Sequence, residues 1–483
     1  MARGKVRKGF FFYLMIFLIL IVAFVGVCVV IMLFSPGKSV LGFQYFSNSA
    51  GYQIVKTTDA SESEINLGKR AYDNIIIDAG PAEVIFENNQ DYDKNCIMII
   101  NKSKGFARDG DIKPFEYSVE IVGNDLVVKV ESSDGFLNFS KDIKVRVHMA
   151  DISAENQQDI LESFKNTNFK VETTTGNVII GGALKKGYST DIYPGSLDIS
   201  TGSGNITLTS HASETYKKVS LSTKSGIISL TDKEKIEATE DNVKIDVGSG
   251  KLRAKVIKDN LDLMSKKGTI EVGEVTGDTS VSARTAILDI NKVGGNLNFE
   301  KGSEVMSDSK VYIDEVGGFV NVLEGRDTDF YLGKIGGAVN IHTTSGLIRL
   351  GSEENLLLGS VYAETTSGKI DAFFGSSLNS RFLVSENGSV NAYFGDAIKG
   401  TLNTISSKKG NVSVKFKSDA KAEFMFDVSD PSDEKKFDLG KVKFDLLQNT
   451  KLSSNPYYFN CSDTGTNAQV KIITDKTVTL DLI

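Results

Sequence analysis

The side chains that most often bind metals are few in this chain and are not grouped. Its three histidines, His148, His211 and His342, share no ligand-like spacing with one another or with a cysteine. Zinc sites need such grouped ligands. The sequence therefore predicts no metal ligand among them, and each histidine is interpreted as an ordinary sheet-surface residue.

One acidic segment imitates the start of a calcium loop. Asp91–Asn95 carries the alternating oxygen ligands, but Cys96 stands where the loop needs glycine, and Lys102 stands where it needs a bidentate glutamate. We therefore predict no calcium there. Cys96 and Cys461 have two interpretations: a disulfide between the two ends of the ectodomain in an oxidising exterior, or two buried thiols.

Catalytic motifs are also missing from the sequence. No nucleophile elbow, phosphate-binding loop or dinucleotide fingerprint occurs, and Gly202-Ser203-Gly204 precedes a strand rather than a helix. A glycan-cleaving β-helix would need carboxylates, or a basic residue with an aspartate, on adjacent coils. The outward-facing column that could supply them is chemically mixed and turns to asparagine: Arg253, Glu271, Asp289, Asn298, Asn321 and Asn340. We predict no catalytic residue, no cofactor-binding residue and no cofactor, and we keep such an enzyme only as a lesser alternative.

Composition narrows the class of protein further. The 483 residues include 55 Lys and Arg against 62 Asp and Glu, a formal net charge of −7, which argues against a nucleic-acid partner. Three cysteines exclude a disulfide-stapled scaffold. Glycine is modestly enriched, at 45 residues, without a collagen-like period.

The N-terminus predicts a membrane anchor. Phe10 to Phe34 is an uncharged, mostly apolar run, long enough as a helix to cross a hydrocarbon layer about 30 Å thick. Arg3, Lys5, Arg7 and Lys8 precede it without an acid, so the positive-inside rule places the N-terminus in the cytoplasm. The alternative, a cleaved signal peptide, would have a shorter apolar region and a small-residue exit. We favour an uncleaved single-pass anchor with the bilayer as its partner.

The remaining chain repeats a short phrase around a glycine, at intervals of about 20 residues. Thirteen copies align on pivots of which only Ala286 is not glycine, at positions 176, 204, 226, 250, 268, 286, 295, 318, 337, 346, 368, 388 and 410. The second and fourth residues after every pivot are apolar, and so is the fifth residue before it. This alternation predicts strand–turn–strand units with one buried face, in which the glycine supplies positive φ or room for close approach.

Units of this length cannot bury an apolar face alone, but stacked copies can. We therefore predict an all-β fold, a single long β-solenoid behind one N-terminal transmembrane helix, with a propeller as the alternative. The two nine-residue gaps, 286 to 295 and 337 to 346, are interpreted as consecutive corners of one coil. Phe374, Phe394 and Phe416 share one column and predict an aromatic ladder inside the coils.

The flanking regions are β-rich but less regular. Strands are predicted around Ile75–Ile77, Glu83–Phe86, Cys96–Ile100, Leu126–Val130 and Ile143–Val147, a helix or long loop at Asp151–Phe164, a surface excursion at Asp427–Lys441 and a closing segment at Gln469–Ile483. The predicted organisation is a basic tail (1–9), a transmembrane anchor (10–34), a linker (35–69), an N-terminal β-rich cap (70–164), the solenoid (165–420) and a C-terminal β cap (421–483).

The strand Lys144–Met149 followed by coils of the type Thr366-Ser367-Gly368-Lys369-Ile370 resembles the bacterial "putative adhesin" domain family. The resemblance covers roughly residues 70–483, although members usually carry a proline where this chain has Met149 or Ala150. It implies a cell-surface, adhesin-like binding or display protein without catalysis, with an extracellular or periplasmic ectodomain and an unidentified protein or glycan ligand. A structural scaffold or self-assembling envelope component remains the alternative.

Overall fold

The architecture is that of a computed structural model, which divides into two units, Met1–Ile192 and Tyr193–Ile483. The residues it describes are 3–34, 39–40, 43–47, 53–54, 72–88, 96–101, 104–108, 116–131, 137–140, 143–149, 166–181, 194–209, 215–230, 235–299, 306–376, 379–395, 398, 403–416, 423–428, 437–438, 457–460 and 469–482.

The first unit begins with helix α1 (Arg3–Phe34), which contains the predicted anchor. Within it, the segment Phe12–Ile31 is long and apolar enough to cross a membrane. Its large apolar side chains, such as Phe12 and Val22, are mostly exposed, so they are not the core of a soluble domain.

All five strands predicted in the N-terminal region are present, as β4 (Asn74–Asp78), β5 (Glu83–Asn88), β6 (Cys96–Asn101), β9 (Asp125–Glu131) and β11 (Ile143–Met149). β4 and β5 are joined by a tight turn, and they pair in parallel with β12 (Asn168–Thr173) and β13 (Val178–Ile180), respectively. Residues 74–88 therefore have the same strand–turn–strand form as the repeats. The other edges of β4 and β5 pair in parallel with β9 and β11, respectively: β4 with β9 and β5 with β11.

Antiparallel strands complete the first unit. β8 (Glu116–Val122) pairs with β9, and β6 pairs with β11 and β3 (Gln53–Ile54). A separate antiparallel sheet has the order β1 (Ser39–Val40), β2 (Phe43–Ser47), β7 (Lys104–Arg108) and β10 (Leu137–Ser140). Asp151–Phe164 lies outside the described residues.

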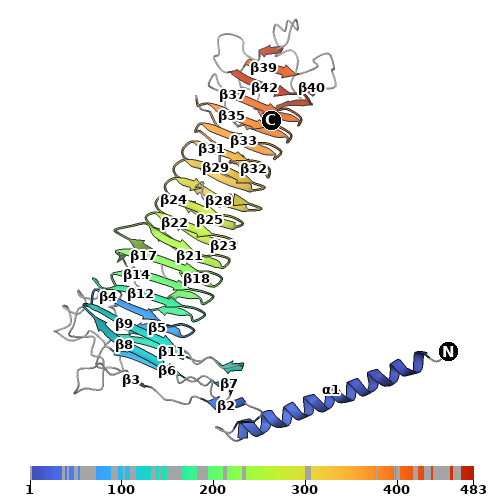
Figure 1. Cartoon of the computed structure of the whole chain (residues 1–483). Helices are drawn as coiled ribbons and strands as arrows, with labels where there is room; N and C mark the ends of the chain where they lie inside the picture. The colour runs from blue at the N-terminus through green and yellow to red at the C-terminus, as the bar shows by residue number, and fades with distance from the viewer. Residues whose placement is uncertain are drawn as a thin grey trace. The chain divides into compact units, whose positions relative to one another are not determined.

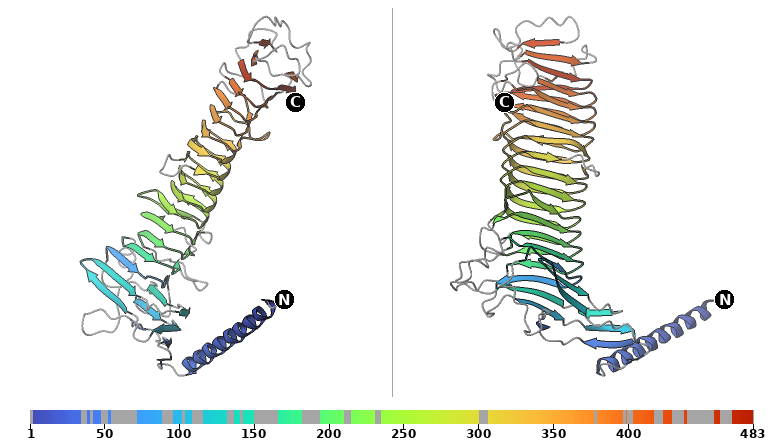
Figure 2. Two further views of the ribbon diagram at one scale, coloured as in Figure 1. Left: turned by 45° about the vertical axis from the view of Figure 1, so that its right-hand side comes forward. Right: turned by 60° about the vertical axis from the view of Figure 1, so that its left-hand side comes forward.

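The second unit is a solenoid of two parallel sheets, and the chain alternates between them as each coil adds a strand to one sheet and then to the other (Figures 1 and 2). Sheet 1 consists, in order, of β14 (Ser196–Thr201), β17 (Lys218–Thr223), β20 (Val243–Asp246), β22 (Leu261–Ser265), β24 (Thr279–Ala283), β26 (Leu297–Phe299), β29 (Val320–Arg326), β31 (Val339–Thr343), β33 (Val361–Thr365), β35 (Arg381–Ser385), β37 (Asn403–Ser407) and β42 (Gln469–Thr474).

Sheet 2 consists of β15 (Ile206–Leu208), β18 (Ile227–Leu230), β21 (Lys251–Lys258), β23 (Thr269–Val275), β25 (Ile287–Val293), β28 (Lys310–Val316), β30 (Asp329–Ile335), β32 (Ile348–Leu350), β34 (Ile370–Phe374), β36 (Val390–Phe394), β38 (Val412–Phe416) and β43 (Val478–Leu482). The short strands β16 (Thr215–Tyr216), β19 (Ile236–Ala238) and β27 (Met306–Ser307) add local pairings. The closing segment is confirmed as a strand pair, because β42 and β43 extend the two sheets.

Alternation sets which side chains form the core. In β34, β36 and β38 the inward positions are buried and the outward positions are accessible to solvent. The predicted aromatic ladder is confirmed: Phe374, Phe394 and Phe416 are buried cross-strand partners, and the rings of the first two are 5.3 Å apart.

One inward position is charged. Arg381 is fully buried, and its guanidinium carbon lies 4.9 Å from the Phe374 ring centroid. Its Nη1 donates to Asn403 Oδ1 (3.1 Å) and its Nη2 to the Gly375 carbonyl (2.8 Å). Burial lowers the pKa of Arg381 to about 10, which still leaves it charged at neutral pH. The Asn403 amide and the phenylalanine rings stabilise this charge inside the coil.

The pivots lie at two corners of the coil, as the nine-residue gaps predicted. Ten of them join sheet 1 to sheet 2 or the equivalent strands of the first unit, while 295, 318 and 337 join sheet 2 back to sheet 1. The thirteen copies therefore do not equal thirteen coils.

Close approach, rather than positive φ, explains the glycines. At Gly388 a Cβ atom would collide with the carbonyl oxygen of Gly368, one coil earlier, and φ is not positive there. A Cβ atom at Gly226 would collide in the same way with the carbonyl oxygen of Gly204. Among the pivots only Gly346 has positive φ.

A buried hydroxyl three residues before the pivot links one coil to the next. Ser407 Oγ accepts from the Gly410 amide (2.9 Å) and donates to the Gly388 carbonyl (2.6 Å) of the preceding coil. Ser385 repeats both bonds with Gly388 and Gly368. Backbone groups at the tight corner are therefore satisfied without water.

We predict that Gly388→Ala destabilises the solenoid by about 1–3 kcal/mol, because the added methyl group overlaps a backbone carbonyl that cannot move independently. Thermal unfolding of the detergent-solubilised full chain, followed by far-ultraviolet circular dichroism, measures this. Gly325→Ala is the matched control, because the nearest atom to its Cβ position is 3.4 Å away and belongs to a side chain. Equal melting temperatures for both variants would contradict the close-approach account.

We also predict that Ser407→Ala costs about 1–3 kcal/mol, because it leaves a buried amide and a buried carbonyl without their hydroxyl partner. Ser407→Thr should keep most of the stability, since Thr365 makes the same amide contact in another coil. Ser406→Ala, on the outward side of the same strand, is the control for the same melting experiment. A Ser407→Ala melting temperature no lower than that of Ser406→Ala would show that the hydroxyl ladder contributes nothing.

Candidate ligand-binding site

The structure describes only some of the candidate metal ligands in the sequence. His342 lies on sheet 1, with Nδ1 3.1 Å from Glu364 Oε2. His148 lies in β11, whose described backbone places it beside Cys96, while His211, Cys461 and Asp91–Asn95 fall outside the described residues. Within the described residues, no group of three His, Cys, Asp or Glu side chains could hold a metal ion.

The predicted outward column is two columns on different sheets. Arg253, Glu271 and Asp289 are cross-strand neighbours on β21, β23 and β25 of sheet 2. The asparagines of the same alignment column instead lie on β26, β29 and β31 of sheet 1: Asn298, Asn321 and Asn340. Aligning every glycine in one register was wrong here, because pivots 295, 318 and 337 belong to the opposite corner.

Glu271 is held by two cations of the neighbouring strand. It pairs with Lys251, and its Oε2 lies 3.2 Å from Arg253 Nε. The Lys251 hydrogen bond, with the nearby positive charges, lowers the pKa of Glu271. A carboxyl group with a lowered pKa is a poor proton donor at neutral pH, so Glu271 lacks the raised pKa that a glycosidase acid needs.

The outward row of sheet 2 continues beyond Asp289 into aromatic and polar side chains that the glycine repeat does not reveal. Cross-strand register adds, coil by coil, Tyr312, Tyr331, Arg349, Asp371, Asn391 and Ser413. The tyrosines escaped notice because their corners carry Ser309 and Thr328 instead of glycine. Both corner residues are buried, and the Ser309 hydroxyl accepts from the Ala286 amide at 2.9 Å. A search for Ser or Thr at the corners could have found them.

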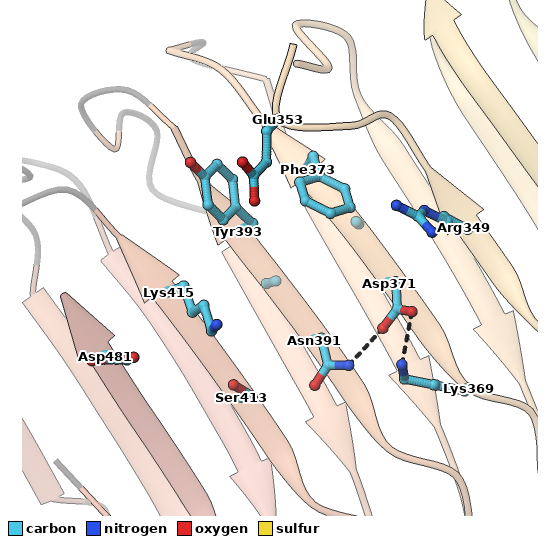
Figure 3. Close-up of a pocket in the computed structure, with 12 residues that line it drawn as sticks. Arg349, Glu353, Lys369, Asp371, Phe373, Asn391, Tyr393, Ser413, Lys415 and Asp481 are labelled. Atoms are coloured by element: carbon cyan, nitrogen blue, oxygen red, sulfur yellow. Dashed lines mark hydrogen bonds and ion pairs between the residues drawn. The ribbon is translucent and has the colours of Figure 1, made fainter. Parts of the chain in front are cut away.

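A depression of about 670 Å³ lies on the outer face of sheet 2, over β32, β34, β36, β38 and β43 (Figure 3). We call it the sheet 2 site. Its lining residues are Arg349, Glu353, Lys369, Asp371, Ala372, Phe373, Asn391, Ala392, Tyr393, Ser413, Lys415 and Asp481. Because side chains alternate along a strand, each strand supplies outward side chains at every second position.

Aromatic rings stand along this site. Phe373 and Tyr393 are cross-strand partners, half-buried, with ring centroids 5.2 Å apart. The guanidinium carbon of Arg349 lies 5.8 Å from the Phe373 centroid. In the two coils before β32, Tyr312 and Tyr331 stack at 4.8 Å and 11° between planes. These contacts favour the ring orientations that the structure shows.

Polar groups lie beside the rings, further along the same strands, and they are held by hydrogen bonds and an ion pair. Asp371 accepts from Asn391 Nδ2 at 2.5 Å and pairs with Lys369 Nζ at 2.8 Å (Figure 3). Arg349 and Lys415 are exposed and can donate to a ligand. The site thus combines apolar rings with fixed donors and acceptors, the composition of a binding surface.

The lowered pKa of Glu271 predicts an acid-dependent contribution to stability. Its charge stabilises the fold above the ordinary carboxyl pKa, and this contribution is lost as pH falls through the lowered folded-state pKa. Glu271→Gln should therefore lower the melting temperature slightly at pH 7, and the difference from the unmodified chain should vanish in acid. Asp289→Asn, one coil on in the same row, is the control. A Glu271→Gln difference that does not change with pH would contradict the ion-pair account.

Comparison with known proteins gives two similar solved structures. One is described as a "putative adhesin" from Bacteroides fragilis, with 11% identity and a TM-score of 0.18 over 93% of this chain and 99% of that chain. The other is described as a "putative cell adhesion protein" from Clostridium sporogenes, with 6% identity and a TM-score of 0.14 over 86% and 95%. No family model and no curated protein matches the sequence. The family that the coil motif suggested fits the names of these two structures.

Proposed function

We propose that this chain is a membrane-anchored surface protein whose solenoid displays an adhesin-like binding site, without catalysis. The observation that carries the proposal is the sheet 2 site, where Phe373, Tyr393 and Arg349 stand on a rigid face beside ordered polar groups. Binding sites are typically built this way, from fixed aromatic side chains with a few convergent polar groups.

The anchor is supported by the N-terminal helix. Its apolar segment Phe12–Ile31 would span about 30 Å at 1.5 Å per residue. The four basic residues before it favour a cytoplasmic N-terminus, which puts the solenoid outside the cytoplasm. In this arrangement the sheet 2 site faces the medium or the periplasm.

The C-terminal end of the solenoid favours display over end-to-end assembly. β42 pairs on its outer edge with β39 (Glu423–Val428), which in turn pairs with β41 (Tyr457–Asn460). β43 pairs with β40 (Phe437–Asp438). Because parallel solenoids polymerise through unpaired terminal strands, these added strands protect that end.

We predict that bacterial cells carrying the full chain bind at least one member of an array of glycans, matrix proteins and cell-wall fragments. Tyr393→Ala should reduce this binding by about tenfold or more, because a central aromatic anchor is lost. Tyr362→Ala, an exposed tyrosine on sheet 1, is the matched control. Surface immunostaining checks that all three chains reach the surface equally.

Three results would overturn the proposal. The first is no binding to any array member by cells that display the chain. The second is binding that Tyr393→Ala leaves unchanged. The third is release of cleavage products from envelope polysaccharide that Glu271→Gln abolishes, because it would make the protein an enzyme.

A further inference from the structure

The sheet 2 site lies on a sheet face, which restricts how a ligand can bind. Strand β34 pairs with β32 and β36, and β36 pairs with β34 and β38, so the ladder hydrogen bonds of these strands are used within the sheet. A peptide that binds by adding a strand needs an open sheet edge. The ligand of this site must therefore be recognised by side chains.

The charges of the site are balanced. Three cationic side chains, Arg349, Lys369 and Lys415, accompany three acidic ones: Glu353, Asp371 and Asp481. A polyanion or polycation would meet as much repulsion as attraction. Carboxylates only accept and ammonium or guanidinium groups only donate, so the mixture suits groups that do both. Hydroxyl groups have that property.

The aromatic rings follow the repeat of the solenoid. Phe373 and Tyr393 occupy adjacent coils, as do Tyr312 and Tyr331, and Tyr331 is the cross-strand partner of Arg349. Adjacent coils are separated by the strand spacing of about 4.8 Å. A linear chain of sugar rings has a repeat of similar length and pairs apolar C–H faces with hydroxyl edges. Successive sugars of such a chain would therefore contact successive coils.

From this juxtaposition we infer that the sheet 2 site binds an uncharged, extended glycan that runs across the strands, one sugar per coil, from the coil of Arg349 to the coil of Lys415. The sugar faces pack on Phe373 and Tyr393. The hydroxyl groups bond to Asp371, Asn391 and Arg349. This inference rests on the proposed function and names its ligand class.

The test uses the full chain in phosphatidylcholine nanodiscs and isothermal titration calorimetry. The probes are the hexasaccharides of cellulose, chitin and amylose, their disaccharides, and an oligogalacturonate hexamer as a charged comparison. At least one neutral hexasaccharide should bind, about tenfold or more tightly than its disaccharide, because several coils contribute. The charged hexamer should bind more weakly than that neutral one.

The variants separate ring stacking from damage to the fold. Tyr393→Ala should weaken hexasaccharide binding by about tenfold or more, whereas Tyr393→Phe should retain most of it, because the ring remains. Tyr362 and Phe382 form an aromatic pair on sheet 1, with ring centroids 6.1 Å apart. Tyr362→Ala and Phe382→Ala should leave binding unchanged. Melting temperatures show whether each variant is folded.

Several outcomes would overturn the inference. Equal affinity for disaccharide and hexasaccharide contradicts an extended site, and tighter binding of the charged hexamer contradicts charge balance. If no hexasaccharide binds while the cell-based array shows Tyr393-dependent attachment to a protein, the glycan assignment is wrong and the proposed function stands. If both experiments show no binding, both proposals are wrong.

Discussion

The short distance between stacked coils, about 4.8 Å, is the constraint on which the rest of the structure depends. At the corners this distance brings one backbone directly against the next. Gly388 has no room for a Cβ beside the Gly368 carbonyl. The buried Ser407 hydroxyl of the next coil donates a hydrogen bond to the Gly388 carbonyl. Corners built in this way fix the register of both sheets.

A fixed register turns sequence positions about 20 residues apart into neighbours. Arg349, Asp371 and Asn391 are consecutive members of one outward row, although they come from three separate coils. The apolar columns beneath them, such as Leu350 and Ala372, form the core independently of what stands outside. The outward side chains can therefore differ from coil to coil while the buried columns keep the same pattern. This separation explains how a stack of similar coils can carry a local site.

Most of the fold follows from patterns that the sequence displays directly. The aliphatic columns predicted the two-faced strands, and Phe374, Phe394 and Phe416 predicted an internal ladder, because both patterns repeat with the coil. The corner hydroxyls were missed, since Thr and Ser at an inward position look like surface residues in an alternating pattern. The buried Arg381 escaped for a related reason: its partners, Asn403 and the Gly375 carbonyl, come from a neighbouring coil and the preceding corner.

The candidate site was less predictable than the fold. Its rows depend on which corner each glycine occupies, and the single alignment joined Arg253 with Asn298, which lie on different sheets. Tyr312 and Tyr331 lie behind corners without glycine, so the repeat pattern did not include them. Spatial rows of this kind need the pairing register, which only the three-dimensional structure supplies.

The central claim is that the outer face of sheet 2 is the ligand-binding surface of a rigid solenoid. An experimental structure of the full chain with a bound neutral hexasaccharide tests it most directly. We expect sugar rings against Phe373 and Tyr393, in a chain that crosses β34, β36 and β38. A glycan bound on sheet 1 beside Tyr362, or at a corner of the coil, would contradict it.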